Sequence, residues 1–129
     1  MPTAYVDDPT IGDDEELWRR IPQYWIDEDP FTGDARIQSP AFDDPRDGTP
    51  MSVYLGSVVR AAGLGPESVL MPGFALAAVT TGTARENGLG IHRAPLPDQP
   101  AHAEVFGTKT KSVKRRLARA ATWLVAPEL

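Results

Sequence analysis

The chain has 129 residues and no cysteine, which excludes disulfide bonds, thiolate metal sites and cysteine nucleophiles. Its length predicts one domain that can bury roughly two thirds of the surface of its unfolded chain. The net charge of −5 is unevenly divided, with 13 acidic and 4 basic side chains in residues 1–47 but 5 acidic and 9 basic in residues 48–129. These regions can attract each other within one fold, pair head to tail between copies, or remain two solvated surfaces.

The first residues of the chain are acidic and carry few apolar side chains. They predict a flexible acidic lead over residues 1–13, followed by one domain over residues 14–129. A secretory signal needs a basic start and an apolar run, and a membrane span needs about 20 apolar residues; neither is found in the sequence. We therefore expect a cytoplasmic protein with no membrane association.

Proline and glycine divide the first half of the chain into short elements. Pro22 ends the first of them because its ring leaves no N–H to donate, and Gly33 favours a hairpin turn because it tolerates positive φ. In chain order, the sequence predicts a helical turn or the start of a strand over residues 14–21, a strand over 24–26, a hairpin turn over 30–34, a returning strand over 35–38 and a polar loop over 43–50.

Hydrophobic spacing is clearer in the second half of the chain. Met51, Val53 and Leu55 alternate as in a strand, residues 55–62 repeat at helical spacing, and the apolar run 74–79 is typical of a buried central strand. The sequence also predicts a helical turn over 66–70, a threonine-capped helix over 84–87, strands over 89–93 and 101–106, and a last helix over 112–124. The predicted fold class is α+β: a small, mainly antiparallel sheet with a C-terminal amphipathic basic helix packed on one face.

The last predicted helix combines an apolar stripe with positive charge. The stripe falls at helical spacing and consists of Val113, Leu117, Ala120, Ala121 and Leu124. Lysines and arginines fill the other faces, so the helix either docks on the sheet with a solvated basic face or contacts phosphates. Its N-terminus concentrates partial positive charge beside two lysines, which predicts an anion site. That site comprises Thr108, Lys109, Thr110, Lys111 and Arg115.

A second group of candidate residues lies outside the basic helix. Arg20 can hold a phosphate through its guanidinium fork, Tyr54 can flank the same cleft, and Glu104 can polarise a sugar hydroxyl. This order of residues resembles that of the ADP-ribosyltransferase superfamily and its RES-type NAD-consuming branch. The resemblance implies an enzyme that uses NAD, with Arg20, Tyr54 and Glu104 as its catalytic residues. The alternative is that Arg19 and Arg20 pair with acidic neighbours.

Five further stretches of sequence, spread over most of the chain, resemble a family of small bacterial proteins. They are residues 17–21, 48–53, 84–90, 100–103 and 107–111. This second resemblance implies no activity, cofactor or partner.

The two histidines give little support for a metal site. His92 and His102 lie ten residues apart and lack the spacing of metal-binding motifs, so no metal site is predicted. His102 and Glu104 share one face of the predicted strand, because side chains alternate along a strand. They are either a general base with its orienting group or a surface pair.

These observations together predict a non-catalytic binding or accessory module that acts through protein–protein contacts. We expect a protein partner or a homo-oligomer, and a phosphate-containing ligand at the start of the last helix. Two alternatives stay open: a small NAD- or nucleotide-processing enzyme, and a weak nucleic-acid binder, which the net charge of −5 disfavours. No cofactor is predicted, except NAD under the enzyme alternative.

Overall fold

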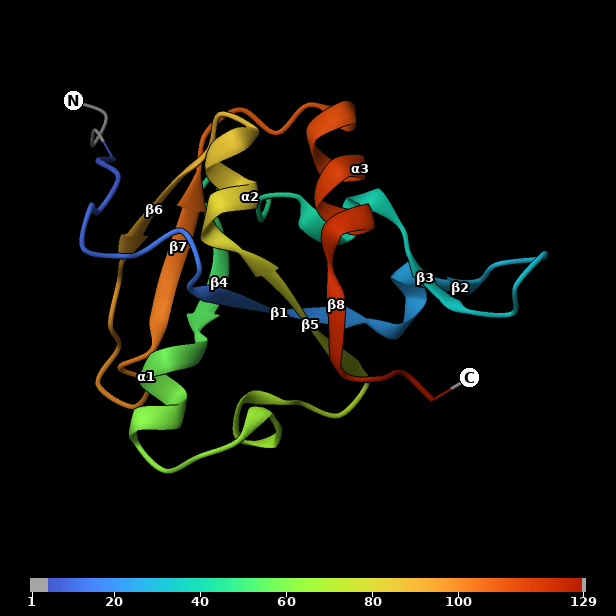
Figure 1. Cartoon of the computed structure of the whole chain (residues 1–129), viewed down its shortest axis with the longest axis horizontal. Coiled ribbons are helices and arrows are strands. Elements are labelled where there is room, and N and C mark those ends of the chain that lie inside the picture. Colours follow the sequence, from blue (N-terminus) through green and yellow to red (C-terminus); the bar gives the residue numbers. More distant parts are fainter. Residues whose placement is uncertain (1–4, 129) are drawn as a thin grey trace.

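The fold, described by a computed structural model for residues 5–128, is an antiparallel six-stranded sheet with helices packed against it (Figure 1). The strand order is β6-β7-β4-β1-β5-β8, and every neighbouring pair is antiparallel. A separate hairpin pairs β2 (Ile26–Glu28) with β3 (Ala35–Ile37). The strands of the larger sheet are β1 (Glu16–Pro22), β4 (Met51–Leu55), β5 (Phe74–Thr80), β6 (Gly90–Arg93), β7 (His102–Phe106) and β8 (Thr122–Val125).

Short helices connect these strands. The helices within residues 5–128 are α1 (Gly56–Ala61), α2 (Thr81–Glu86), α3 (Lys111–Ala120) and the 3₁₀ helices η1 (Gln23–Trp25), η2 (Ser39–Phe42) and η3 (Pro66–Val69). Figure 1 shows α2 and α3 beside each other over the sheet, with α1 at the opposite end of the molecule. None of these helices is long and apolar enough to cross a lipid bilayer.

The central strand β1 divides the core into two clusters. Its side chains alternate between the faces of the sheet, so Leu17 and Ile21 point to one side and Trp18 to the other. Leu17 and Ile21 belong to the larger cluster, which also contains Leu117 of α3. Trp18, with no exposed surface, packs with Val59 of α1 in the second cluster. The sheet is therefore covered by α2 and α3 on one face and partly by α1 on the other.

The α+β class and the mainly antiparallel sheet predicted from the sequence are confirmed. The strand over residues 51–55 that passes directly into a helix is also confirmed, because β4 ends at Leu55 and α1 begins at Gly56. The predicted strand over residues 24–26 is wrong in its first two residues. Residues 23–25 form η1, and β2 begins only at Ile26.

The last helix is shorter than predicted. α3 ends at Ala120, Ala121 has extended backbone angles, and residues 122–125 form β8, which pairs with β5. The sequence of β8 is rich in β-branched and aromatic residues, which pack well on a sheet. The predicted apolar stripe is consequently divided: Val113 is buried on α3, whereas Leu124 packs in the second cluster from β8.

Residues 7–13 contain neither helix nor strand, yet they are tied to the rest of the domain. Ile11 is 2% exposed and belongs to the larger core cluster. The backbone N–H of Asp8 donates to the carbonyl of Ile91 (2.8 Å), and the N–H of Ile91 donates to a carboxylate oxygen of Asp7 (2.9 Å). Arg85 of α2 adds an ion pair with Asp7 (3.1 Å). The acidic and basic regions thus attract each other within one fold. The lead predicted over residues 1–13 includes residues 1–4, which lie outside the described residues, and its flexibility stays a prediction.

Candidate functional site

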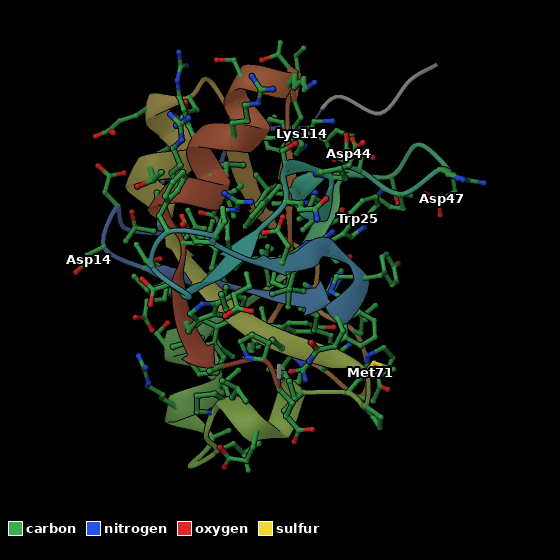
Figure 2. The ribbon with its side chains drawn as sticks, turned by 90° about the vertical axis from the view of Figure 1, so that its right-hand side faces the viewer. Asp14, Trp25, Asp44, Asp47, Met71 and Lys114 are labelled. Atoms are coloured by element: carbon green, nitrogen blue, oxygen red, sulfur yellow. The ribbon has the colours of Figure 1, made fainter. Side chains whose placement is uncertain are left out.

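An open pocket of about 440 Å³ lies where β1 ends and where β4 and β5 begin. Its other walls come from η1, η2 and the loop that follows η2. Figure 2 labels three of its residues, Trp25, Asp44 and Met71, along one side of the molecule. The polar and aromatic residues that line the pocket are Arg19, Arg20, Tyr24, Trp25, Asp43, Asp44, Ser52, Tyr54 and Phe74.

Arg19 is held in the pocket wall by backbone carbonyls. Its Nε donates to Ala41 (3.1 Å), its Nη1 to Ser52 (2.8 Å) and its Nη2 to Asp43 (3.5 Å). Burial lowers the pKa of Arg19 to about 10, and the negative charge of Asp44 acts in the opposite direction. The guanidinium is still charged at neutral pH. No carboxylate of residues 5–128 forms an ion pair with it.

Arg20 reaches the pocket from the opposite face of β1. Its Nε donates to the carbonyl of Val69, and its guanidinium carbon lies 4.8 Å from the centroid of the Tyr54 ring, a cation–π arrangement. Within the described part of the chain, the terminal Nη groups of Arg20 have no hydrogen-bond or ion-pair partner. The side chain is therefore oriented by its Nε and its stacking, while its fork is left for a ligand.

The two carboxylates of the pocket are neutralised by lysines. Asp44 Oδ1 lies 2.7 Å from Lys109 Nζ, and Asp43 Oδ2 lies 3.2 Å from Lys114 Nζ. Figure 2 shows Asp44 and Lys114 labelled close to each other at the upper part of the molecule. Each aspartate of the pocket is thus paired with a lysine, and neither arginine of the pocket forms an ion pair within residues 5–128.

The predicted anion site at the start of α3 is brought together only in part. The side chain of Lys109 is 2% exposed, and its Nζ donates to the carbonyls of Val105 (2.8 Å) and Gly107 (3.4 Å) as well as to Asp44, so its three N–H donors are used. Thr110 caps α3 through a bond from the N–H of Val113 (3.1 Å).

The other members of the predicted set lie on the surface. Thr108, Lys111 and Arg115 are exposed. Arg115 lines a different groove, together with Arg36 and Trp123, between α3 and the β2–β3 hairpin. Nothing in the structure tests anion binding by these three residues, and their site stays a prediction.

Ser52 and His102 form a hydrogen-bonded pair next to the pocket. Nδ1 of His102 lies 2.8 Å from the carbonyl oxygen of Ala94, and its Nε2 lies 3.0 Å from Oγ of Ser52. The ring of Tyr54 packs edge-on against the imidazole, with centroids 5.9 Å apart. Ser52 lines the pocket and separates His102 from it.

The three residues of the NAD-enzyme alternative are divided by the fold. Arg20 and Tyr54 line the pocket and touch each other. Glu104 is two strands away from β1, on β7, and its Oε1 lies 2.9 Å from Nε2 of His92, which has no hydrogen-bond partner in the described part of the chain. Among residues 5–128, no group of three or more acidic or histidine side chains is placed to hold a metal ion.

Sequence reasoning missed Arg19 as a pocket residue, the Ser52–His102 pair and the burial of Lys109. The signal for the pair was alternation: Ser52 and Tyr54 share one face of β4, as His102 and Glu104 share one face of β7. Only the register, in which Tyr54 faces His102, places the serine within reach of the imidazole.

Comparison of the chain with protein-family models, curated proteins and solved structures found no match. Function is therefore inferred from the geometry of the pocket.

Proposed function

We propose that this chain is a ligand-binding module that holds an anionic group in the pocket between η2, β4 and the end of β1. One observation carries the proposal: two adjacent arginines, Arg19 and Arg20, line the same pocket and have no ion-pair partner in residues 5–128. Buried or half-buried charges are normally paired. A ligand with an anionic group would pair with the Nη groups of Arg20, whereas Arg19 is held by backbone carbonyls.

The chemistry of the wall supports a small ligand with a phosphate or carboxylate and a flat ring. A guanidinium fork matches the paired oxygens of either anion. Trp25, Tyr54 and Phe74 supply aromatic surface beside the arginines. A volume of about 440 Å³ is in the range typical of small-molecule sites. A mononucleotide has this combination of charge, ring and size.

This proposal keeps the accessory role expected from the sequence but moves the anion from Lys109 to Arg20. Lys109 supports the pocket indirectly, because it neutralises Asp44. An NAD-consuming reaction through Glu104 is less well supported, since Glu104 is not among the residues that line the pocket. The protein partner or homo-oligomer expected from the sequence stays a prediction.

The test is isothermal titration calorimetry with inorganic phosphate, AMP and adenosine. We expect AMP to bind and adenosine to bind more weakly. Arg20→Ala should weaken AMP binding about tenfold to a hundredfold, because a hydrogen bond to a charged group contributes about 1.5–3 kcal/mol. Arg20→Lys keeps the charge but loses the guanidinium fork, so the affinity of this variant for AMP should lie between that of the unaltered protein and that of Arg20→Ala.

The matched control is Arg60→Ala. Arg60 also lies over an aromatic ring, 5.1 Å from the centroid of Trp18, but it is paired with Glu16 and is not among the pocket residues. It should bind AMP like the unaltered protein. If neither phosphate nor AMP binds, or if Arg20→Ala and Arg60→Ala behave alike, the proposal is wrong.

A further inference from the structure

The hydrogen bonds around His102 define its tautomer. The carbonyl oxygen of Ala94 can only accept, so the proton of the neutral ring resides on Nδ1, which donates to it at 2.8 Å. Nε2 is then an unprotonated nitrogen with a free lone pair. Oγ of Ser52, 3.0 Å away, donates its hydroxyl proton to that lone pair.

We propose that Ser52 is the nucleophile of an acyl-ester hydrolase, with His102 as its general base and the carbonyl of Ala94 as the group that orients the base. A serine hydroxyl within hydrogen-bond reach of an imidazole that a third group orients is the arrangement that activates a nucleophile. The substrate class is a carboxylic ester that carries a second, anionic group. The anionic part of this inference rests on the proposed function, because Arg20 is the residue that holds that group.

The surroundings of Ser52 favour chemistry over a purely structural bond. Its backbone is fixed, because its carbonyl accepts from Nη1 of Arg19 (2.8 Å) and the residue is paired in register with Glu104 of β7. Its side chain is partly exposed and lines the pocket. The ring of Tyr54 packs edge-on against the imidazole. A fixed hydroxyl beside an oriented base, open to a ligand pocket, is preorganised for attack.

The reaction proceeds in two balanced steps. In the first, Oγ of Ser52 forms a bond to the acyl carbon while its proton passes to Nε2 of His102. The carbon–oxygen bond to the alcohol then breaks, and the alcohol leaves with that proton, so that an acyl-serine remains. In the second, water attacks the acyl carbon, its proton passes through Nε2 to Oγ, and the carboxylic acid leaves. The only co-reactant is water.

The first experiment is covalent labelling of the full chain with a fluorophosphonate, followed by intact mass and peptide mapping. The proposal expects one adduct, on Ser52. Ser57 is the internal control, because it is exposed and its hydroxyl is bound to the carboxylate of Glu15. Ser52→Ala should abolish the adduct, and His102→Gln should slow its formation at least about a hundredfold. Thermal unfolding of both variants reports whether they fold.

The second experiment compares hydrolysis of para-nitrophenyl acetate with that of the para-nitrophenyl monoester of succinic acid, which carries a carboxylate. Ser52→Ala should lower kcat for both esters at least about a thousandfold. Arg20→Ala should raise the ratio of KM for the succinate ester to KM for the acetate ester about tenfold, because only the succinate ester carries a carboxylate.

The outcomes separate the two proposals. If AMP binds but no adduct forms on Ser52 and neither ester is hydrolysed, the nucleophile is refuted and the binding module stands. If Ser52 is labelled but Arg20→Ala does not alter the preference between the esters, the anionic substrate is refuted along with the role of Arg20. An adduct that forms equally on Ser52 and Ser57 also overturns the inference, because it shows no activation.

Discussion

Replacing Lys109 by methionine should destabilise the protein far more than the same change at Lys114. Both lysines pair with an aspartate of the loop after η2, but their surroundings differ. The Lys109 side chain is 2% exposed and has three acceptors, whereas Lys114 is 17% exposed and faces an aspartate that is 55% exposed. Methionine preserves the apolar stem of either lysine and removes only its charge and donors.

The size of the stability loss depends on the groups that lose their partner when Lys109 is replaced. Removing one partner of a buried ion pair costs about 3–5 kcal/mol, but Asp44 is 37% exposed and retains a bond from the N–H of Met51 (2.9 Å), so water compensates part of the loss. The two carbonyls that Lys109 bonded lose a donor as well. We expect a loss of about 2–3 kcal/mol for Lys109→Met, and about 0–1 kcal/mol for Lys114→Met, since an exposed pair contributes little.

Urea denaturation followed by tryptophan fluorescence measures both changes. With a slope of about 1–3 kcal/mol per molar urea, Lys109→Met should lower the midpoint by about 0.7–3 M, and Lys114→Met should lower it by much less. Lys109→Met should also weaken AMP binding, because Asp44 is then uncompensated beside Arg19. Equal midpoints for the two variants would refute the reasoning that burial, and not charge alone, makes Lys109 important.

Two smaller predictions concern packing and acid titration. Gly56→Ala should lower stability by about 1–3 kcal/mol in a thermal melt, because a Cβ there would lie 2.6 Å from Nε1 of the fully buried Trp18; an unchanged melting temperature would contradict this packing. The pKa of Asp8 is lowered mainly by the hydrogen bond from the Thr10 hydroxyl and next by the bond from the Thr10 N–H. Thr10→Val removes the hydroxyl, so carboxyl NMR titrations should show the pKa of Asp8 raised towards its ordinary value. The stabilisation that ionised Asp8 gives should then be lost at a higher pH on acidification.

Features that depend on neighbouring residues in the chain were predicted correctly from the sequence. The alternation in β4 and the capping threonine before α2 were both readable, and Thr80 does cap that helix through the N–H of Thr83 (3.2 Å). The hairpin turn was readable as well, because Gly33 has the positive φ (76°) that was expected of it. Each of these features depends on neighbours within a few residues.

Features that depend on contacts between residues far apart in the chain were not predicted from the sequence, or were predicted wrongly. Helical spacing continued to Leu124, but pairing with β5 converted residues 122–125 into a strand. Lys109 looked like an exposed anion ligand because sequence does not show that Asp44, far away in the chain, lies beside it. The pocket itself joins residues from β1, η2, β4 and β5, and only the strand order brings these segments to one place.

The segment before β1 makes the two edges of the sheet unequal for self-association. An outer strand normally presents free N–H and C=O groups that invite a strand from another molecule. On β6, Asp7 and Asp8 already occupy the outward N–H and carbonyl of Ile91, and they place negative charge along that edge. β8, at the other end of the sheet, carries Trp123 and Leu124 instead. Strand addition at β6 is thus hindered at Ile91 by Asp7 and Asp8, and β8 is the edge that these contacts leave open to a second copy.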